Sequence, residues 1–367
     1  MPQVTLVAAF RVVTGTRKVD QLPDSDNHPA RRPISRDNFT QHEFPSQMAL
    51  LQAERQVGVK LDLLSSWYSL DMVKGFGPQK AKDIWREGIS PETLLEHPQL
   101  LPHTGATGDR LSHAIDSLSE DDIRLARKRA LSQMRRAAKL DATILTYDHQ
   151  SYPVLILESN NPSPVLYARG NLRILKNPKA IACVGTRQIS NAYSNAHARF
   201  TTHAAANGWT IVSGFALGAD TIGHRSAIAA GGTTICVMPS GLDRPFPPEN
   251  RELWRELETC DQAAMISELP FGTSASSMNL RKRNKLIVAS AQAVLVSQSA
   301  EKGGAMNAFR FAVEQHKPVA TFEWDESEAT SGNRHIANEH RIPTTVLAVN
   351  GDQGSWNKWL EKLSSLI

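Results

Sequence analysis

Short apolar segments that alternate with helical segments constrain this sequence more than any other feature. From residue 142 onward, each apolar run of three to six residues is followed by a stretch with helical spacing or by a turn. Apolar strands alternating with helices are typical of a buried, mostly parallel sheet covered by helices on both faces. The predicted strands are Ala142–Leu145, Val165–Ala168, Ala180–Val184, Thr210–Val212, Thr233–Met238, Ala264–Ser267, Ala293–Val296, Pro318–Thr321 and Thr344–Val349. We therefore predict an α/β fold with an extended Rossmann-like, doubly wound sheet, whose ligand lies outside the carboxyl ends of the strands.

The region before this pattern is helical. Apolar residues recur at spacings of three and four from residue 44 to about residue 140. Within it, Gly75-Phe76-Gly77 forms a tight turn and Pro78 opens a new helix at its favoured first position. This pattern resembles a helix-hairpin-helix, in which Gly75, Gly77 and Lys80 contact a nucleic-acid phosphate. The alternative is a hairpin that only packs.

These patterns divide the chain into three parts. Residues 1–45 show weak periodicity and are predicted to be a poorly ordered extension with one stray strand near residues 4–13. Residues 46–140 form a small helical domain of helix-hairpin-helix or SAM-like type. Residues 141–367 form the Rossmann-like domain. A polar stretch, Trp324–His340, is predicted to be a long loop, and Ser355–Ile367 a terminal helix.

Composition narrows the class of protein without deciding its function. A hydrophobic content of 41% allows an ordinary globular core, and a net charge of +4 permits a phosphate or nucleic-acid ligand without requiring one. The three cysteines have no CxxC spacing, so neither a disulfide framework nor a zinc site is predicted. No apolar run approaches the roughly 20 residues of a membrane helix. We expect a cytoplasmic protein without metal, cofactor or membrane association.

One strand-to-helix turn has the features of an anion site. The strand Ile181–Val184 leads into Gly185-Thr186-Arg187 and then, at Ser190, into a helix that begins with small polar residues. The first backbone N–H groups of a helix have no internal partners, and the helix dipole adds partial positive charge there. Arg187 adds a fixed, forked cation. We predict that this turn holds a phosphate.

Other loops with glycines, cations or aromatic rings follow the neighbouring strands or open helices, so a parallel sheet brings them to one edge. Glycines let a ligand approach the backbone, the basic side chains neutralise phosphates, and Phe246 and Phe271 offer flat surfaces for bases. Together they predict a groove for an extended, phosphorylated ligand, although any single glycine-rich turn or basic cluster is equally typical of a solvated surface. The additional candidates are Ser213, Gly214, Ser240, Gly241, Phe246, Asn250, Arg281, Lys282, Arg283 and Asn284.

No catalytic residues are predicted. Asp220 and His224 are one helical turn apart and could act as an acid–base pair, but a structural role for both is the simpler interpretation. The sequence contains no Gly-x-Ser-x-Gly elbow, no Gly-x-Gly-x-x-Gly dinucleotide fingerprint after a strand and no Walker A loop.

The motifs, taken in order, resemble the DNA-processing protein A family, also called DprA or Smf. The matching segments span residues 152–321 and include Pro164–Asn171, Val184–Arg187, Val212–Asp220 with His224, Gly231–Val237, Ser240–Asp243, Phe246–Asn250, Ser267-Glu268 and Arg283–Ile287. The resemblance implies an extended Rossmann fold preceded by a small helical domain. It also implies a homodimer that binds and protects single-stranded DNA during natural transformation, loads the recombinase RecA, and needs no catalysis.

The resemblance also assigns residues. Arg187 matches the family's phosphate-binding arginine, and its pocket residues correspond to Ser213, Gly214, Gly241, Phe246 and Asn284. This sequence has Thr233 where a lysine is usual in the family, which we expect to remove one phosphate contact. Two alternatives stay open: a phosphoribohydrolase-like enzyme acting on nucleotides, and a nucleotide-sensing module. Against the enzyme, the segment Gly303–Ala308 lacks the Gly-Thr and glutamate of the phosphoribohydrolase loop.

Overall fold

The computed structural model describes residues 46–102, 106–351 and 353–366. The predicted N-terminal extension, with the strand expected near residues 4–13, lies outside the described residues. No helix among the described residues is both long enough and apolar enough to cross a membrane.

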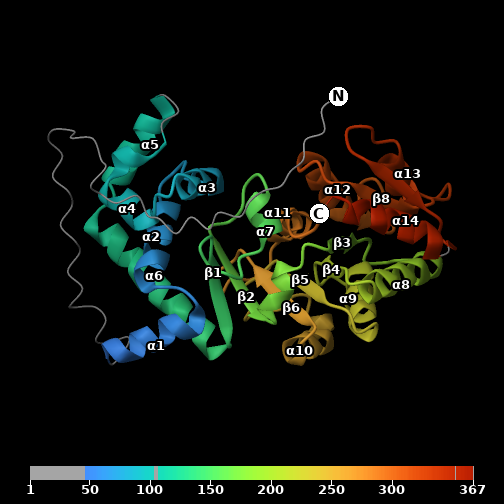
Figure 1. Ribbon diagram of the computed structural model, residues 1–367, viewed down its shortest axis with the longest axis horizontal. Helices are drawn as coiled ribbons and strands as arrows, with labels where there is room; N and C mark the ends of the chain where they lie inside the picture. The colour runs from blue at the N-terminus through green and yellow to red at the C-terminus, as the bar shows by residue number, and fades with distance from the viewer. Residues whose placement is uncertain (1–45, 103–105, 352, 367) are drawn as a thin grey trace.

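Helices make up the first part of the described chain, as predicted, and lie together at one end of the molecule (Figure 1). The longest, α6, starts with a capping box in which Ser119 and Asp122 satisfy each other's backbone N–H groups. Pro78 occupies the first position of α3, as its fixed φ favours. The bounds are α1 Gln47–Val57, α2 Leu61–Asp71, α3 Pro78–Arg86, α4 Pro91–Glu96, a 3-10 helix Pro98–Leu100, α5 Ala106–Asp116 and α6 Glu120–Lys139.

A nine-stranded sheet forms the centre of the described structure, in the order β1-β2-β6-β5-β4-β3-β7-β8-β9. The β1–β2 and β2–β6 pairs are antiparallel, and all the other pairs are parallel. The predicted Rossmann-like, mostly parallel sheet is therefore confirmed. The strands are β1 Ala142–Thr146, β2 Val165–Gly170, β3 Ala180–Val184, β4 Thr210–Ser213, β5 Thr234–Val237, β6 Ala263–Ser267, β7 Ala293–Val296, β8 Val319–Phe322 and β9 Thr344–Leu347.

Helices cover both faces of the sheet, because alternate side chains of each strand point to opposite faces. In β3, Ile181 and Cys183 join the core beneath α8 and α14, whereas Ala182 and Val184 join the core beneath α11 and α12. The helices are α7 Val154–Glu158, α8 Asn191–Ala206, α9 Ala219–Ala229, α10 Arg251–Thr259, α11 Ser277–Ala289, α12 Ala305–Glu314, α13 Ser331–Ala337 and α14 Gln353–Ser364, with 3-10 helices Leu172–Lys176, Pro248–Asn250 and Glu328–Thr330.

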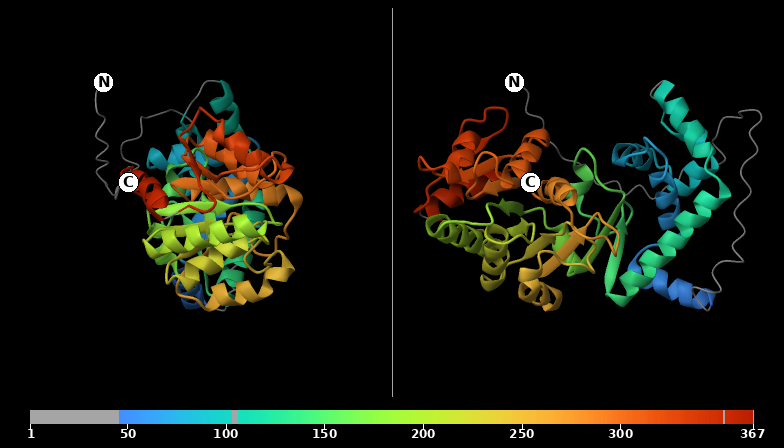
Figure 2. Two further views of the ribbon diagram at one scale, coloured as in Figure 1. Left: turned by 90° about the vertical axis from the view of Figure 1, so that its right-hand side faces the viewer. Right: turned by 180° about the vertical axis from the view of Figure 1, so that it is seen from behind.

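The helical part is fastened to the sheet through α6, which extends beyond the sheet toward the other helices (Figure 2). The Gln133 side chain accepts a hydrogen bond from the backbone N–H of Phe271 at 2.8 Å and donates one to its carbonyl at 3.3 Å. Arg136 forms an ion pair with Asp243 at 3.1 Å. One hydrophobic core includes residues of both parts and crosses the boundary predicted near residue 140, so the division into two domains stays a prediction.

The prediction of a long loop at residues 324–340 is wrong in part, because this segment contains α13. Few apolar residues mark this helix in the sequence, and Ile336 is its only fully buried aliphatic side chain. A buried polar residue fixes it instead. The Asn333 side chain accepts from the N–H of Ser299 at 3.0 Å and donates to the carbonyls of Ser297 and Phe322. These partners follow β7 or end β8, so hydrophobic periodicity along the chain could not reveal them.

Candidate functional site

The strand order places a topological switch point beside β3. From β3, the chain proceeds through β4, β5 and β6 in one direction, then returns to β7 on the other side of β3 and continues to β8 and β9. Ligands of open α/β sheets bind at such a reversal, outside the carboxyl ends of the strands. We call the edge formed by residues 185–190, 214–218, 238–250, 268–276 and 297–300, together with Arg281, Lys282 and Asn284 on α11, the carboxyl rim. The turn around Arg187 lies in it at the switch point.

The turn that follows β3 is braced from the neighbouring strand. Gln298, just after β7, accepts the N–H of Thr186 on its backbone carbonyl at 2.9 Å and the N–H of Ser190 on its side-chain oxygen at 2.8 Å. Ser190 precedes the first residue of α8 but makes no side-chain capping bond. The first N–H groups of α8 therefore have no capping side chain, and they lie beside the exposed Arg187. An anion site requires such an arrangement.

Gly218 lets the next loop pack against the same turn. Its φ is +76°, and a Cβ added to it would lie 2.4 Å from the carbonyl oxygen of Arg187 and 2.6 Å from that of Thr186. The N–H of Ala219 donates to the Thr186 carbonyl at 3.3 Å. The loops that follow β3 and β4 thus hold each other in place through a contact that only glycine allows.

Gly218→Ala should therefore destabilise the protein by clearly more than Gly231→Ala. Gly231 has a similar φ of +72°, but a Cβ there would meet nothing within 4 Å, so its substitution carries only the conformational cost of about 1–2 kcal/mol. At Gly218 the ψ of −124° lies outside the left-handed helical region, so the conformational cost is larger, and the clash with backbone oxygens is added to it. Urea unfolding of both variants measures the difference, and equal losses would contradict the proposed packing of the two loops.

The structure does not support a direct phosphate contact by Arg283. Its side chain is buried, and its Nη1 donates to the carbonyls of Gly214 and of Val237, the latter at 2.6 Å. A Cβ on Gly214 would overlap the guanidinium. Arg283 thus joins the ends of β4 and β5 from below the rim. The sequence-based assignment of Arg283 as a phosphate ligand is corrected to a positioning role.

The polar side chains of Ser213, Ser240 and Asn250 also hold loops together. Ser213 Oγ donates to the Cys183 carbonyl at 2.6 Å, and Ser240 Oγ donates to the Arg244 carbonyl at 2.6 Å. Asn250 Nδ2 donates to the carbonyl of Phe215 at 2.9 Å. All three are buried, so in this structure their side chains shape the rim and do not line its surface.

Phe215 and Asn284 complete the scaffold around these loops. Phe215 is a non-glycine residue with a φ of +68°, a strained conformation of the kind found at functional sites, and sequence reasoning missed it. Gly241 is as tightly placed as Gly218, since an added Cβ would lie 2.6 Å from the carbonyl oxygen of Pro270. Asn284 is partly exposed and contacts the Gly304 carbonyl at 3.4 Å, which links α11 to the loop after β7.

The exposed part of the rim is basic and partly apolar. Arg187, Arg244, Arg281 and Lys282 are exposed, and no carboxylate in the described residues forms an ion pair with any of them.

The two phenylalanines expected to stack with bases differ in exposure. Phe246 is 36% exposed, whereas Phe271 is buried against Tyr167, so the prediction of a base-stacking surface at Phe271 is wrong. Leu217 and Met278 are also exposed in or beside the rim. No pattern in the sequence indicated that these two are exposed, because apolar residues at loop ends are normally buried.

Asp220 and His224 do not face an open cleft. Asp220 is buried, accepts the N–H of Ala216 at 3.1 Å and lies near Arg283, while His224 Nδ1 contacts Thr234 Oγ1 at 2.7 Å. Burial lowers the pKa of His224 to about 3, so its imidazole is neutral over the usual pH range. Both side chains stabilise the structure, in agreement with the simpler interpretation. Residues 46–102, 106–351 and 353–366 contain no group of three or more His, Cys, Asp or Glu that could hold a metal ion.

The expectation that Thr233 removes a phosphate contact is also wrong. It immediately precedes β5, at the edge of the sheet opposite the carboxyl rim, and its hydroxyl contacts that of Thr210 at 2.8 Å. Because a lysine at this position would also begin β5, its absence removes no contact from the rim.

The predicted hairpin is present, but two of its basic residues, Lys80 and Lys82, already have partners within the protein. Gly75 has a φ of +96°, and Gly77 precedes α3 without capping it through a side chain. Lys80 lies 3.8 Å from Asp83, and Lys82 is buried and donates to the Ser159 carbonyl at 2.6 Å. These contacts support the packing interpretation of the hairpin, while a phosphate contact by Gly75, Gly77 and Lys80 stays a prediction.

Comparison with known proteins identifies the family. The model of the family described as DNA recombination-mediator protein A matches residues 143–348, which is more than half of the chain. Protein Smf of Synechocystis is 34% identical over 178 residues, which are 48% of this chain and 44% of that protein. DNA processing protein DprA of Bacillus subtilis is 28% identical over 242 residues, which are 63% of this chain and 79% of that protein. The chain thus spans less than half the length of the Smf protein.

Solved structures show the same fold. DNA processing protein A from Streptococcus pneumoniae superposes with a TM-score of 0.60 at 20% identity, covering 76% of this chain and 94% of that one. DNA processing protein A from Helicobacter pylori superposes with a TM-score of 0.52 at 24% identity, covering 60% and 96%. With the matched sheet, the rim loops and the family model in agreement, this chain belongs to the DNA recombination-mediator protein A family, also known as DprA or Smf.

Proposed function

We propose that this protein binds single-stranded DNA along the carboxyl rim, with Arg187 as the central phosphate contact. The observation that carries the proposal is the exposed guanidinium of Arg187, in a braced turn at the topological switch point and beside the uncapped start of α8. Backbone N–H groups at a helix start and an arginine together bind phosphate oxygens well.

The other exposed groups of the rim support the binding of an extended DNA strand rather than of an isolated phosphate. Arg281 and Lys282 provide cations on α11, Arg244 provides one after β5, and the exposed ring of Phe246 offers a surface on which a base can stack. The N–H groups of Thr186 and Ser190 are bonded to Gln298, so these two residues offer their hydroxyl groups, while Gly185 contributes its backbone and Asn284 its amide. A single-stranded DNA binding mode has been described for the related Helicobacter pylori protein.

Family membership extends the proposal to DNA processing in the cytoplasm. In that role the protein would act as a homodimer, protect incoming single strands during natural transformation and help load the recombinase RecA. The proposal assigns binding residues and no catalytic residue. Ser213, Gly214, Ser240, Gly241, Asn250 and Arg283 act in it by holding the loops that carry the contacts.

Arg187→Ala should weaken binding of a mixed-sequence oligonucleotide by about 10- to 100-fold, because hydrogen bonds to charged groups contribute roughly 1.5–3 kcal/mol. Fluorescence anisotropy across a series of salt concentrations measures this. The slope of log K against log salt should also fall by about 0.7, since one phosphate contact is lost from a single strand.

The matched control is Arg173→Ala, an exposed arginine that follows β2 at the opposite edge of the sheet. It should leave both the affinity and the salt slope unchanged. The proposal fails if Arg187→Ala binds like the parent at every salt concentration, or if duplex DNA binds as tightly as the single strand.

A further inference from the structure

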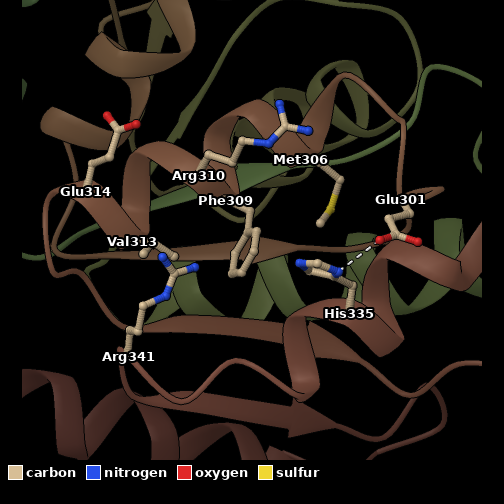
Figure 3. Close-up of a pocket in the computed structure, with 8 residues that line it drawn as sticks. All are labelled: Glu301, Met306, Phe309, Arg310, Val313, Glu314, His335 and Arg341. Carbon is tan, nitrogen blue, oxygen red and sulfur yellow. Dashed lines mark hydrogen bonds and ion pairs between the residues drawn. The ribbon is translucent and has the colours of Figure 1, made fainter.

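A second hollow lies outside the proposed DNA groove, between α12, α13 and the segment that leads into β9 (Figure 3). Its volume is about 380 Å³, within the range of about 300–1,000 Å³ typical of small-molecule sites. It shares no lining residue with the predicted DNA site. The loop 297–304 separates the two, since Gln298 braces the Arg187 turn while Glu301 lines the hollow.

The floor of the hollow is apolar and aromatic. Met306 and Phe309 are each 2% exposed, and Val313 follows one turn later on α12. The Phe309 ring meets the His335 ring edge to face, with the centroids 5.8 Å apart and the planes at 86°. Figure 3 shows both rings standing between the two walls. The buried Phe309 supports the His335 ring, which is about half exposed and can stack on a flat heterocycle.

Arginines come from opposite walls. Arg310 projects from α12, and Arg341 projects from the segment before β9 (Figure 3). Glu339 neutralises Arg341 through hydrogen bonds of 2.9 and 2.6 Å. Arg310 donates to the neutral Asn307 side chain at 2.9 Å, and no carboxylate of the described residues forms an ion pair with it. Glu314, one turn after Arg310, also lines the hollow but forms no ion pair with it among the described residues. The hollow therefore offers one guanidinium without an ion-pair partner and a second, fixed one, both of which an anionic group can contact.

The other end of the hollow offers groups for the edge of a base. His335 Nδ1 lies 3.1 Å from Glu301 Oε1, and both side chains are about half exposed. The second oxygen of Glu301 can accept from an exocyclic amino group of a base, and the second ring nitrogen of His335 can pair with the ring edge. Glu301 would repel a ligand that is only an anion, so the arrangement favours a molecule with a phosphate at one end and an amino-bearing ring at the other.

We propose that this hollow binds a nucleoside monophosphate with an amino-substituted base, which stacks on the half-exposed His335 ring and has its phosphate at Arg310. The same chemistry is present in a free nucleotide and in the 5′-phosphorylated end of a DNA strand. The site is separate from the carboxyl rim, so it stands or falls independently of the proposed binding of single-stranded DNA.

Isothermal titration of the full chain with dAMP, adenosine and inorganic phosphate tests the proposal. We expect dAMP to bind, with adenosine and phosphate each at least 10-fold weaker because each lacks half of the contacts. Arg310→Ala should weaken dAMP binding by about 10-fold or more. The matched control is Arg334→Ala, an exposed arginine of α13 that pairs with Glu326 and does not line the hollow, and it should bind dAMP normally.

Two further arms identify the site and the source of the ligand. Arg187→Ala should keep dAMP binding, although it weakens oligonucleotide binding by about 10- to 100-fold. If the hollow takes strand ends, a 5′-phosphorylated oligonucleotide should displace dAMP from the parent protein and a 5′-hydroxyl one should not; if neither displaces it, the ligand is the free nucleotide. Absence of dAMP binding at millimolar concentration overturns the proposal, as does dAMP binding that depends on Arg187 and not on Arg310.

Discussion

Replacing Arg283 with alanine should lower the free energy of unfolding by about 3–5 kcal/mol, because it leaves an uncompensated charge in the interior. The guanidinium is buried, donates to the carbonyls of Gly214 and Val237, and lies near the Asp220 carboxyl. Burial raises the pKa of Asp220, and the charge of Arg283 acts against that rise. Without Arg283, two carbonyls lose their donor and Asp220 must either ionise alone or take up a proton.

Urea unfolding at neutral pH measures the loss. The control is Arg281→Ala, two residues earlier on α11 but exposed, which should change stability by no more than about 0.5 kcal/mol. A second substitution, Asp220→Asn in the Arg283→Ala background, removes the unpaired carboxylate and should restore part of the lost stability. If Arg283→Ala is as mild as Arg281→Ala, the guanidinium does not stabilise the loops as we describe.

The contrast between neighbouring residues of α11 shows what the sequence could predict about the site. The strand pattern correctly brought the basic cluster near the other loops, because parallel strands end at one edge. It could not tell which cations reach solvent, since successive helical residues point about 100° apart. Arg281 and Lys282 are exposed, but Arg283 points inward to carbonyls from β4 and β5 that are about 50 to 70 residues distant in the chain.

The same limit explains the errors over Phe271 and over the loop predicted at residues 324–340. Phe246 and Phe271 both lie in loops, but Phe246 is exposed and Phe271 is buried. The difference comes from α6 and Tyr167, which pack over Phe271 from distant parts of the chain. Strands were predictable because each consists of consecutive apolar residues. A helix such as α13, held mainly by the buried amide of Asn333, leaves no comparable periodic signal.

The direction of each strand, by contrast, can be inferred from the sequence. It shows that Thr233 cannot belong to the phosphate-binding edge, contrary to the expectation stated for it. A residue that precedes an apolar strand lies at the amino edge of a parallel sheet, whereas this fold binds ligands at the carboxyl edge. Thr233 precedes β5 and Ser240 follows it, so only the second of these positions belongs to the rim.

Mild acid should destabilise this protein, because two histidines are buried in their neutral form. His197 on α8 and His224 on α9 are fully buried, each with a ring Nε2 that has no hydrogen-bond partner in the described residues. Burial lowers the pKa of His197 to about 4 and that of His224 to about 3. Arg283 lowers the second pKa further by charge repulsion.

The direction of the effect follows from the protons bound in each state. The unfolded imidazoles titrate near 6.5, so between about pH 6.5 and 4 the unfolded chain binds more protons than the folded one. Each imidazole then costs about 1.4 kcal/mol of stability per pH unit, or about 3 kcal/mol for the pair at pH 5.5. Burial raises the pKa of Asp220 and Glu268, so these carboxyls oppose the loss by protonating first in the folded state.

Unfolding free energies measured between pH 5 and 7.5 test this through their slope, which does not depend on how much a substitution destabilises the protein overall. His197→Gln and His224→Gln should each reduce the slope below pH 6.5 by about 1.4 kcal/mol per pH unit, and the double variant should remove both contributions. His340→Gln, at an exposed position, should leave the slope as in the parent. Parallel curves for the parent and the double variant would show that His197 and His224 do not cause the acid sensitivity, and that they are protonated to the same extent in the folded and unfolded chain.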